Sequence, residues 1–137
     1  RLYQRVRERA GLAYSVYSSL QMMSDCGAIM LYAATEEKKL AKTELIIYEE
    51  LTKLCETKIT AKELRRAQEQ SKSGIMMSLE SMSSRMQSMG KSELEEGFHE
   101  TIATTIERVE SVQADDILRL SQEYLGCEGW SVAEIRG

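Results

Sequence analysis

The sequence has 137 residues, 42% of them apolar, and its 18 basic and 22 acidic side chains give a net charge of −4. This size and composition suit one domain with a single core, and the charge gives no reason to expect nucleic acid or an anionic membrane as a partner. No apolar run approaches the roughly 20 residues that span a bilayer, so we expect a soluble, cytoplasmic protein.

The chain opens with a positively charged segment that has helical spacing. Four arginines against one glutamate give residues 1–10 a charge of +3, and the remaining 127 residues carry −7. The apolar stripe of the expected helix consists of Leu2, Tyr3, Val6 and Ala10. No capping residue precedes this stripe, which indicates a fragment of a longer protein.

After Gly11 the apolar pattern changes to alternation, which predicts a half-buried strand. Its inward face is expected to hold Tyr14, Val16, Leu20 and Met22. Residues 24–27 have turn chemistry, and residues 28–34 are apolar on both faces. We therefore predict a hairpin over 13–34, with the second strand more buried than the first.

Helical patterns fill most of the remaining chain. Thr35 is a candidate N-cap for a first helix, whose buried face we assign to Leu40, Ile47, Leu51 and Leu54. Thr60 and Glu63 match a capping box and open a long helical pattern, with a kink or break expected near Gly74, Ser81–Ser84 or Gly90. Two short helices follow around 102–109 and 117–125, and residues 129–135 alternate as one more strand. The predicted fold class is α+β, an antiparallel or mixed sheet with several helices on one face.

Most of the chemically reactive side chains have structural interpretations. One histidine, His99, cannot build a zinc site of two or three histidines, and we expect it on a surface loop without a chemical role. The cysteines are expected to be reduced structural thiols, the methionines to fill the core and the acidic clusters to be solvated helix faces. These groups are Cys26, Cys55 and Cys127; Met76, Met77, Met82, Met86 and Met89; and Glu49, Glu50, Glu93, Glu95 and Glu96.

Arg7 and Tyr14 stand on either side of Gly11. A helix end and a strand start joined by a glycine can bring a fixed cation and a phenolic donor to one rim of the sheet. Spacing alone favours the simpler interpretation, in which Arg7 is a surface charge and Tyr14 a half-buried core residue.

The opening string R-L-Y-Q-R-V-R-E-R-A-G-L-A-Y-S-V resembles the signature of the pitrilysin/insulinase zinc metallopeptidases, including the mitochondrial processing peptidase type. The resemblance covers nearly the whole chain and includes further similar segments. They are Tyr32–Thr35, the Thr60 capping box with Glu63, Leu64 and Ala67, Leu79–Ser81 and Ser83–Met86.

The resemblance implies a peptidase of two homologous α+β halves that close over a peptide or unfolded polypeptide. This chain is then the latter part of the second half, one partial domain over 1–137 that binds no metal itself. The motif H-x-x-E-H, whose histidines hold the zinc of the parent protein, belongs to the first half and is absent here. By resemblance, Tyr14 donates to the substrate carbonyl oxygen as zinc-bound water attacks, and Arg7 holds substrate backbone or carboxylate. The fragment alone is not expected to be active.

Two other functions stay open at this point. The family includes non-catalytic homologues that lack zinc ligands and serve as substrate-binding or assembly subunits, so the partner of this chain is either the other half or a homologous subunit. The last possibility is an unrelated α+β interaction module whose methionine-rich face binds a helix.

Overall fold

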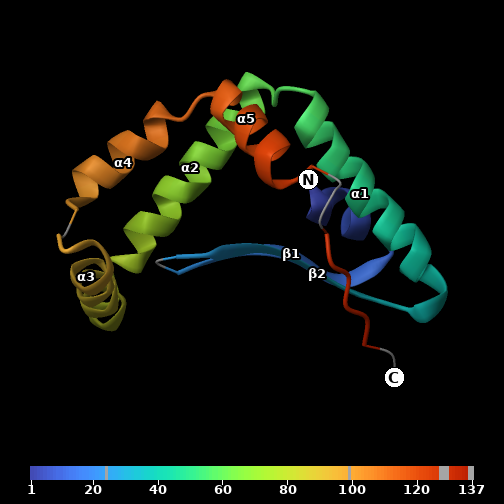
Figure 1. Ribbon diagram of the computed structural model, residues 1–137, viewed down its shortest axis with the longest axis horizontal. Coiled ribbons are helices and arrows are strands. Elements are labelled where there is room, and N and C mark those ends of the chain that lie inside the picture. Colours follow the sequence, from blue (N-terminus) through green and yellow to red (C-terminus); the bar gives the residue numbers. More distant parts are fainter. Residues whose placement is uncertain (24, 99, 127–129, 136–137) are drawn as a thin grey trace. The chain divides into compact units, whose positions relative to one another are not determined.

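The computed structural model describes residues 1–23, 25–98, 100–126 and 130–135. These residues belong to two compact units, Arg1–Thr57 with Arg119–Gly137, and Lys58–Leu118. The first unit contains the β1–β2 hairpin, the short helices η1 and η2, and α1, all labelled or traceable by colour in Figure 1. The α+β fold class is therefore confirmed.

The first helix, η1 (Tyr3–Arg9), is wound more widely than its spacing suggests. It is a π-helix, in which the Ala10 N–H donates to the Arg5 carbonyl five residues back, at 3.2 Å. The chain leaves the helix through Gly11, whose φ of +57° lies in the left-handed region, and the Leu12 N–H returns to the Val6 carbonyl at 2.9 Å. This end resembles the glycine-terminated end of an α-helix, widened by one residue.

The hairpin pairs β1 (Ala13–Met22) with β2 (Gly27–Thr35) in antiparallel register, as predicted. The register is irregular at its start. Ala13 faces Thr35 and Ser15 faces Ala34, so two steps along β1 match a single step along β2. Tyr14 is the extra residue of this β-bulge, and a bulge turns its residue out of the regular alternation.

The bulge and the small core explain why the burial predicted for the hairpin is wrong. Of the four side chains assigned to the inward face of β1, only Val16 is buried, whereas Tyr14, Leu20 and Met22 are exposed. Strand β2 is not the more buried one, since Ile29, Met30 and Tyr32 are exposed and none of its residues is buried. An alternating pattern indicates which face of a strand is apolar. Burial of that face additionally requires another element that covers it.

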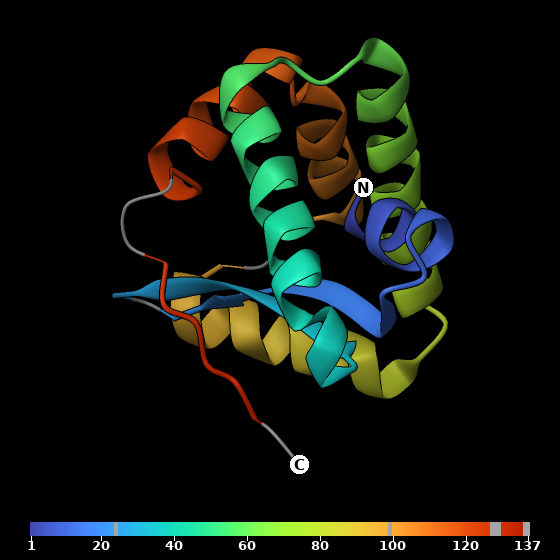
Figure 2. The same ribbon diagram turned by 90° about the vertical axis from the view of Figure 1, so that its right-hand side faces the viewer.

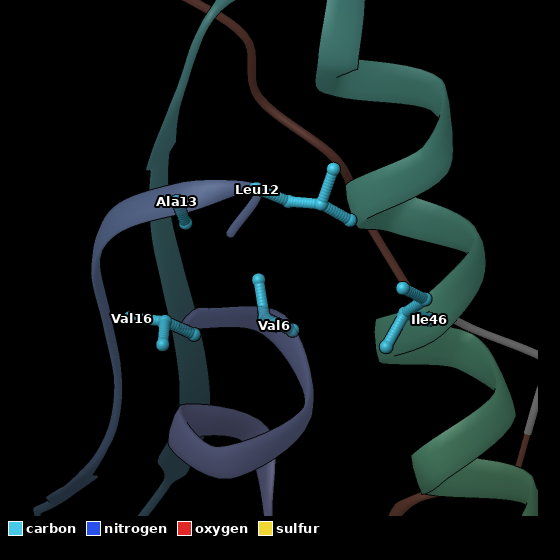
Figure 3. Packing of buried hydrophobic residues seen from close by; sticks show 5 residues of the cluster. All are labelled: Val6, Leu12, Ala13, Val16 and Ile46. Atoms are coloured by element: carbon cyan, nitrogen blue, oxygen red, sulfur yellow. The ribbon is translucent and has the colours of Figure 1, made fainter. Parts of the chain in front are cut away.

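The core of the first unit lies between the hairpin, η1 and α1 (Leu40–Glu56). Figure 3 shows Val6 between Val16 of β1 and Ile46 of α1, with the Leu12 side chain directed toward α1. Val6 is completely buried. Both η1 and α1 lie on the same side of the hairpin (Figure 2), which confirms the predicted one-sided packing for these two helices.

The start and the buried face of α1 differ from expectation. The short 3₁₀ helix η2 (Glu37–Lys39) precedes it, so Thr35 ends β2 and caps no helix. Its hydroxyl already donates to the Leu12 carbonyl. The residues of α1 that are buried are Thr43, Ile46, Glu50 and Leu51. The expectation that Glu50 lies with Glu49 on a solvated helix face is therefore wrong.

The second unit contains α2 (Ala61–Ser78), α3 (Met82–Glu96) and α4 (Ile102–Ser111), and α5 (Ala114–Tyr124) begins in it. The predicted capping box is confirmed, because the Thr60 hydroxyl accepts from the Glu63 N–H while the Glu63 carboxylate accepts from the Thr60 N–H. The expected break lies at residues 79–81, where Ser81 caps α3. Gly74 and Gly90 lie within unbroken helices.

The methionines do not fill a core. All five that were expected to do so are exposed, namely Met76, Met77, Met82, Met86 and Met89. Glu93 and Glu95 are exposed as expected. The thiols also differ from expectation, since Cys26 is exposed. Cys55 is half-buried and donates to the Ser121 carbonyl at 3.2 Å. His99 and Cys127 lie outside the described residues.

The predicted C-terminal strand is wrong for the part of it that the structure describes. Residues 130–135 have no regular secondary structure, and the sheet formed by the described residues has two strands. Gly129 lies outside the described residues. Alternating side chains make a strand only when the backbone pairs with a sheet edge, and residues 130–135 pair with neither β1 nor β2.

We expect Gly11→Ala to lower the free energy of unfolding of the intact protein by about 1–2 kcal/mol, because a Cβ disfavours the left-handed conformation. Space is not the obstacle, since nothing lies within 4 Å of the added Cβ. Gly74→Ala is the matched control: its site is equally open but helical, so alanine should stabilise by roughly 0.5–1 kcal/mol. Urea denaturation followed by circular dichroism measures both, and equal effects would contradict the conformational explanation.

Candidate functional site

A group of ionic and hydroxyl contacts fixes the segment around Gly11. Arg5 reaches from η1 to α1, where Nη1 is 2.5 Å from Glu50 Oε1 and Nη2 is 3.1 Å from Glu49 Oε2. Lys53 also contacts Glu50, at 3.1 Å. Burial acts to raise the pKa of Glu50, but the hydrogen bonds from Arg5 and Lys53 outweigh it, so the pKa is lowered. Glu50 is therefore a charged anchor that holds η1 against α1.

Arg7 is exposed on η1 and takes no part in this anchor. Its guanidinium carbon is 5.1 Å from the centroid of the Tyr3 ring, within the range of a cation–π contact. Among the described residues Arg7 makes no ion pair. A guanidinium held by a ring and not by a carboxylate keeps its five N–H donors available to another group.

Tyr14 is the most exposed tyrosine among the described residues, with 73% of its surface accessible. Its hydroxyl has no hydrogen-bond partner within the part of the chain that the structure describes. The interpretation of Tyr14 as a half-buried core residue is therefore wrong, and the phenol is presented to solvent. Arg7 and Tyr14 flank the Gly11 joint, but no contact between their side chains occurs among the described interactions.

A third polar side chain lies near Tyr14, and the sequence alone gave no sign of it. Lys39, at the end of η2, donates to Glu36 Oε1 at 2.6 Å. This hydrogen bond raises the pKa of Lys39, partial burial acts against it, and the Tyr14 phenol adds a smaller electrostatic contribution that raises it further. The hydrogen bonds from Lys39 and Lys38 lower the pKa of Glu36. The Lys39 ammonium is thus paired with Glu36, and its link to Tyr14 is a weak electrostatic one.

The backbone beside Tyr14 is held by two threonines. The Thr35 hydroxyl donates to the Leu12 carbonyl at 2.5 Å and lies 3.3 Å from the hydroxyl of Thr43. Thr43 is 1% exposed and also donates to the Lys39 carbonyl at 3.0 Å. The rim that carries Tyr14 is consequently tied to both η2 and α1.

The described residues do not fit a zinc site. No three side chains of histidine, cysteine, aspartate or glutamate among them lie close enough together to hold a metal ion. Within the same residues, no helix has both the length and the apolar content that crossing a membrane requires. What the segment on either side of Gly11 offers is a pair of exposed hydrogen-bond donors, namely the Tyr14 phenol and the Arg7 guanidinium.

A protein-family model described as the peptidase M16 inactive domain matches residues 1–71. These residues include the whole hairpin, η1 and α1. Arg7, Tyr14 and Lys39 all lie inside the matched region.

Several bacterial relatives are similar over most of the chain. The zinc protease YmxG of Bacillus subtilis, described as uncharacterized, is 38% identical over 135 residues, which are 98% of this chain and 33% of that protein. An uncharacterized zinc protease of Mycobacterium tuberculosis is 36% identical over 125 residues, 91% of this chain and 28% of that protein. The chain spans about a third of the length of these curated relatives.

Among solved structures, a chain of complex III from Candida albicans with Inz-5 bound has a similar fold. Its TM-score is 0.80 at 18% identity, over 90% of this chain and 29% of that chain. At this identity the likeness concerns the fold alone.

We expect Glu50→Gln to lower the free energy of unfolding by about 2 kcal/mol at pH 7, because charged hydrogen bonds to a buried carboxylate are lost. A lowered pKa means that this stabilisation is present above the ordinary glutamate value of about 4.3 and is lost as the pH falls through the folded-state value. The difference between the intact protein and its Glu50→Gln variant should therefore shrink below about pH 4.

The control is Glu49→Gln, whose side chain is 44% exposed and should contribute only a few tenths of a kcal/mol, roughly. Urea denaturation at pH 7 and below pH 4 measures both variants. A loss that is equal in the two variants, or independent of pH, would show that Glu50 is not the anchor.

Proposed function

Because the chain belongs to the peptidase M16 family, we propose that it is the part of a zinc-dependent endopeptidase that presents Tyr14 and Arg7 to a bound peptide. The observation that carries the proposal is the β-bulge at the start of an otherwise regular hairpin, where Tyr14 is exposed and its hydroxyl has no partner among the described residues. The relatives named zinc proteases support the reaction class, namely peptide-bond hydrolysis.

Tyr14 is suited to stabilise developing negative charge. Hydrolysis of a peptide bond converts the carbonyl oxygen into an oxyanion, and a donor aimed at that oxygen stabilises the transition state more than the ground state. The Tyr14 hydroxyl is exposed and has no partner among the described residues, so it can donate to a substrate without first breaking a bond within this part of the protein. In this proposal Tyr14 donates a hydrogen bond and does not transfer its proton.

Arg7 is suited to bind the peptide. Its planar group donates in a fixed fork that matches a carboxylate or two backbone carbonyls. The contact with the Tyr3 ring keeps the guanidinium oriented without neutralising it. Arg7 then fixes the peptide, while Tyr14 acts at the reacting carbonyl.

Zinc belongs, in this proposal, to the part of the protein outside this chain, since the residues described here do not fit a metal site. The description of the matching family model as an inactive domain agrees with a division of labour between two parts. The donors would meet the peptide only when both parts enclose it, which makes closure a condition of hydrolysis.

The same word, inactive, favours a second candidate, a non-catalytic homologue that binds peptide or assembles with another subunit. Metal analysis and peptide hydrolysis by the intact protein separate the two. One tightly bound zinc with hydrolysis supports the peptidase, whereas peptide binding without either supports the homologue.

We expect Tyr14→Phe in the zinc-loaded intact protein to lower kcat about 100-fold, because loss of one oxyanion donor has this typical cost. The measurement is steady-state cleavage of a quenched-fluorescence peptide. Tyr17→Phe is the control, since Tyr17 lies on the same strand, is 53% exposed and stacks on Tyr32. An unchanged kcat for Tyr14→Phe would remove the oxyanion role.

We expect Arg7→Ala to raise KM for the same peptide by about tenfold or more, with a smaller effect on kcat, because a charged hydrogen bond to substrate is lost. Arg9→Ala, which removes an exposed charge from the same helix, is the control. Equal effects of the two variants would assign the result to net charge and not to a specific contact.

A further inference from the structure

The bulge that exposes Tyr14 is a weak point of the hairpin. An extra residue on one strand interrupts the ladder of backbone hydrogen bonds, so the segment before Ser15 needs other contacts to keep a single conformation. The structure provides such contacts on both sides of Leu12. Its N–H donates to the Val6 carbonyl at 2.9 Å, and its carbonyl accepts the Thr35 hydroxyl at 2.5 Å.

The Thr35 hydroxyl in turn contacts the Thr43 hydroxyl. Each hydroxyl has one proton, so the three contacts of this pair have two protons between them. The Thr35 proton goes to the Leu12 carbonyl, its shortest contact, and the Thr43 proton is shared between the Thr35 oxygen, 3.3 Å away, and the Lys39 carbonyl, 3.0 Å away. The pair therefore links the peptide before the bulge to η2 and to the interior of α1.

Burial makes this link rigid. Thr43 is 1% exposed and Leu12 is 6% exposed, so water does not readily replace the hydroxyl at the Leu12 carbonyl. Without this link, the backbone at the bulge would sample several conformations, and the exposed Tyr14 side chain would change direction with it. A catalytic donor has to be held close to its productive position.

We infer that Thr35, supported by Thr43, is a positioning residue for Tyr14: its hydroxyl fixes the Leu12–Ala13 peptide and thereby the direction in which the bulge presents the phenol. This inference rests on the proposed function of Tyr14. It assigns a role to a residue whose sequence context suggested only a helix cap.

The test measures peptide cleavage by the intact, zinc-loaded protein and its variants. Thr35→Val, which keeps the shape but removes the donor, should lower kcat about tenfold or more, with a smaller change in KM. Thr35→Ser restores a hydroxyl and should bring kcat back to within about twofold of the original value. Thr57→Val, at an exposed threonine of the same unit, is the control and should change neither constant.

A double variant distinguishes positioning from general stability. If Thr35 acts through Tyr14, then Thr35→Val should have less than about a twofold effect on kcat once Tyr14 is phenylalanine. A tenfold loss that persists in the Tyr14→Phe background, or an unchanged kcat for Thr35→Val alone, would overturn the inference. If the Thr35→Val protein does not fold, Thr43→Val provides the test. It removes the hydroxyl that supports Thr35 and should lower kcat severalfold. A kcat equal to that of the original protein would contradict the inference.

The two proposals fail in different ways. Tyr14→Phe with an unchanged kcat removes the proposed function and this inference together. Tyr14→Phe with a large loss, alongside Thr35→Val with none, leaves the function standing and overturns the positioning role alone.

Discussion

The burial of Val6 is the contact on which the first unit depends. Val6 is completely enclosed and lies between the hairpin and α1, so η1 cannot move without opening the small core. Gly11 follows the end of η1 and turns the chain directly into β1. The ion pairs of Arg5 with Glu49 and Glu50 add a second connection between η1 and α1.

The bulge in β1 lets neighbouring residues of one strand serve two purposes, packing against the core and exposure to solvent. Ala13 and Val16 face the core and hold β1 in place, whereas Tyr14 projects to solvent. A regular alternation would have put Tyr14 and Val16 on the same face. The additional residue thus frees one side chain for interaction with another molecule without loss of the packing on either side of it.

The sequence predicts the elements of this chain well and their burial less well. The change of period at Gly11, the hairpin and the capping box at Thr60 all follow from local chemistry and are present. The bulge at Tyr14 could not be predicted, because a register shift depends on which residues face each other across the strands. The hydroxyl link from Thr35 and the buried charge of Glu50 depend equally on tertiary contacts between residues 23 and 45 positions apart. Arg7 and Tyr14 entered as candidates through the family resemblance, and their roles stay proposals.

A structure of the intact protein with a peptide bound tests the central claim most directly. The account predicts the Tyr14 hydroxyl within hydrogen-bond distance, about 2.5–3.0 Å, of the carbonyl oxygen of the bond to be cut, with the bulge and the Thr35 contact to Leu12 retained. A bound peptide whose reacting carbonyl is held by other groups, with Tyr14 still facing solvent, would contradict it.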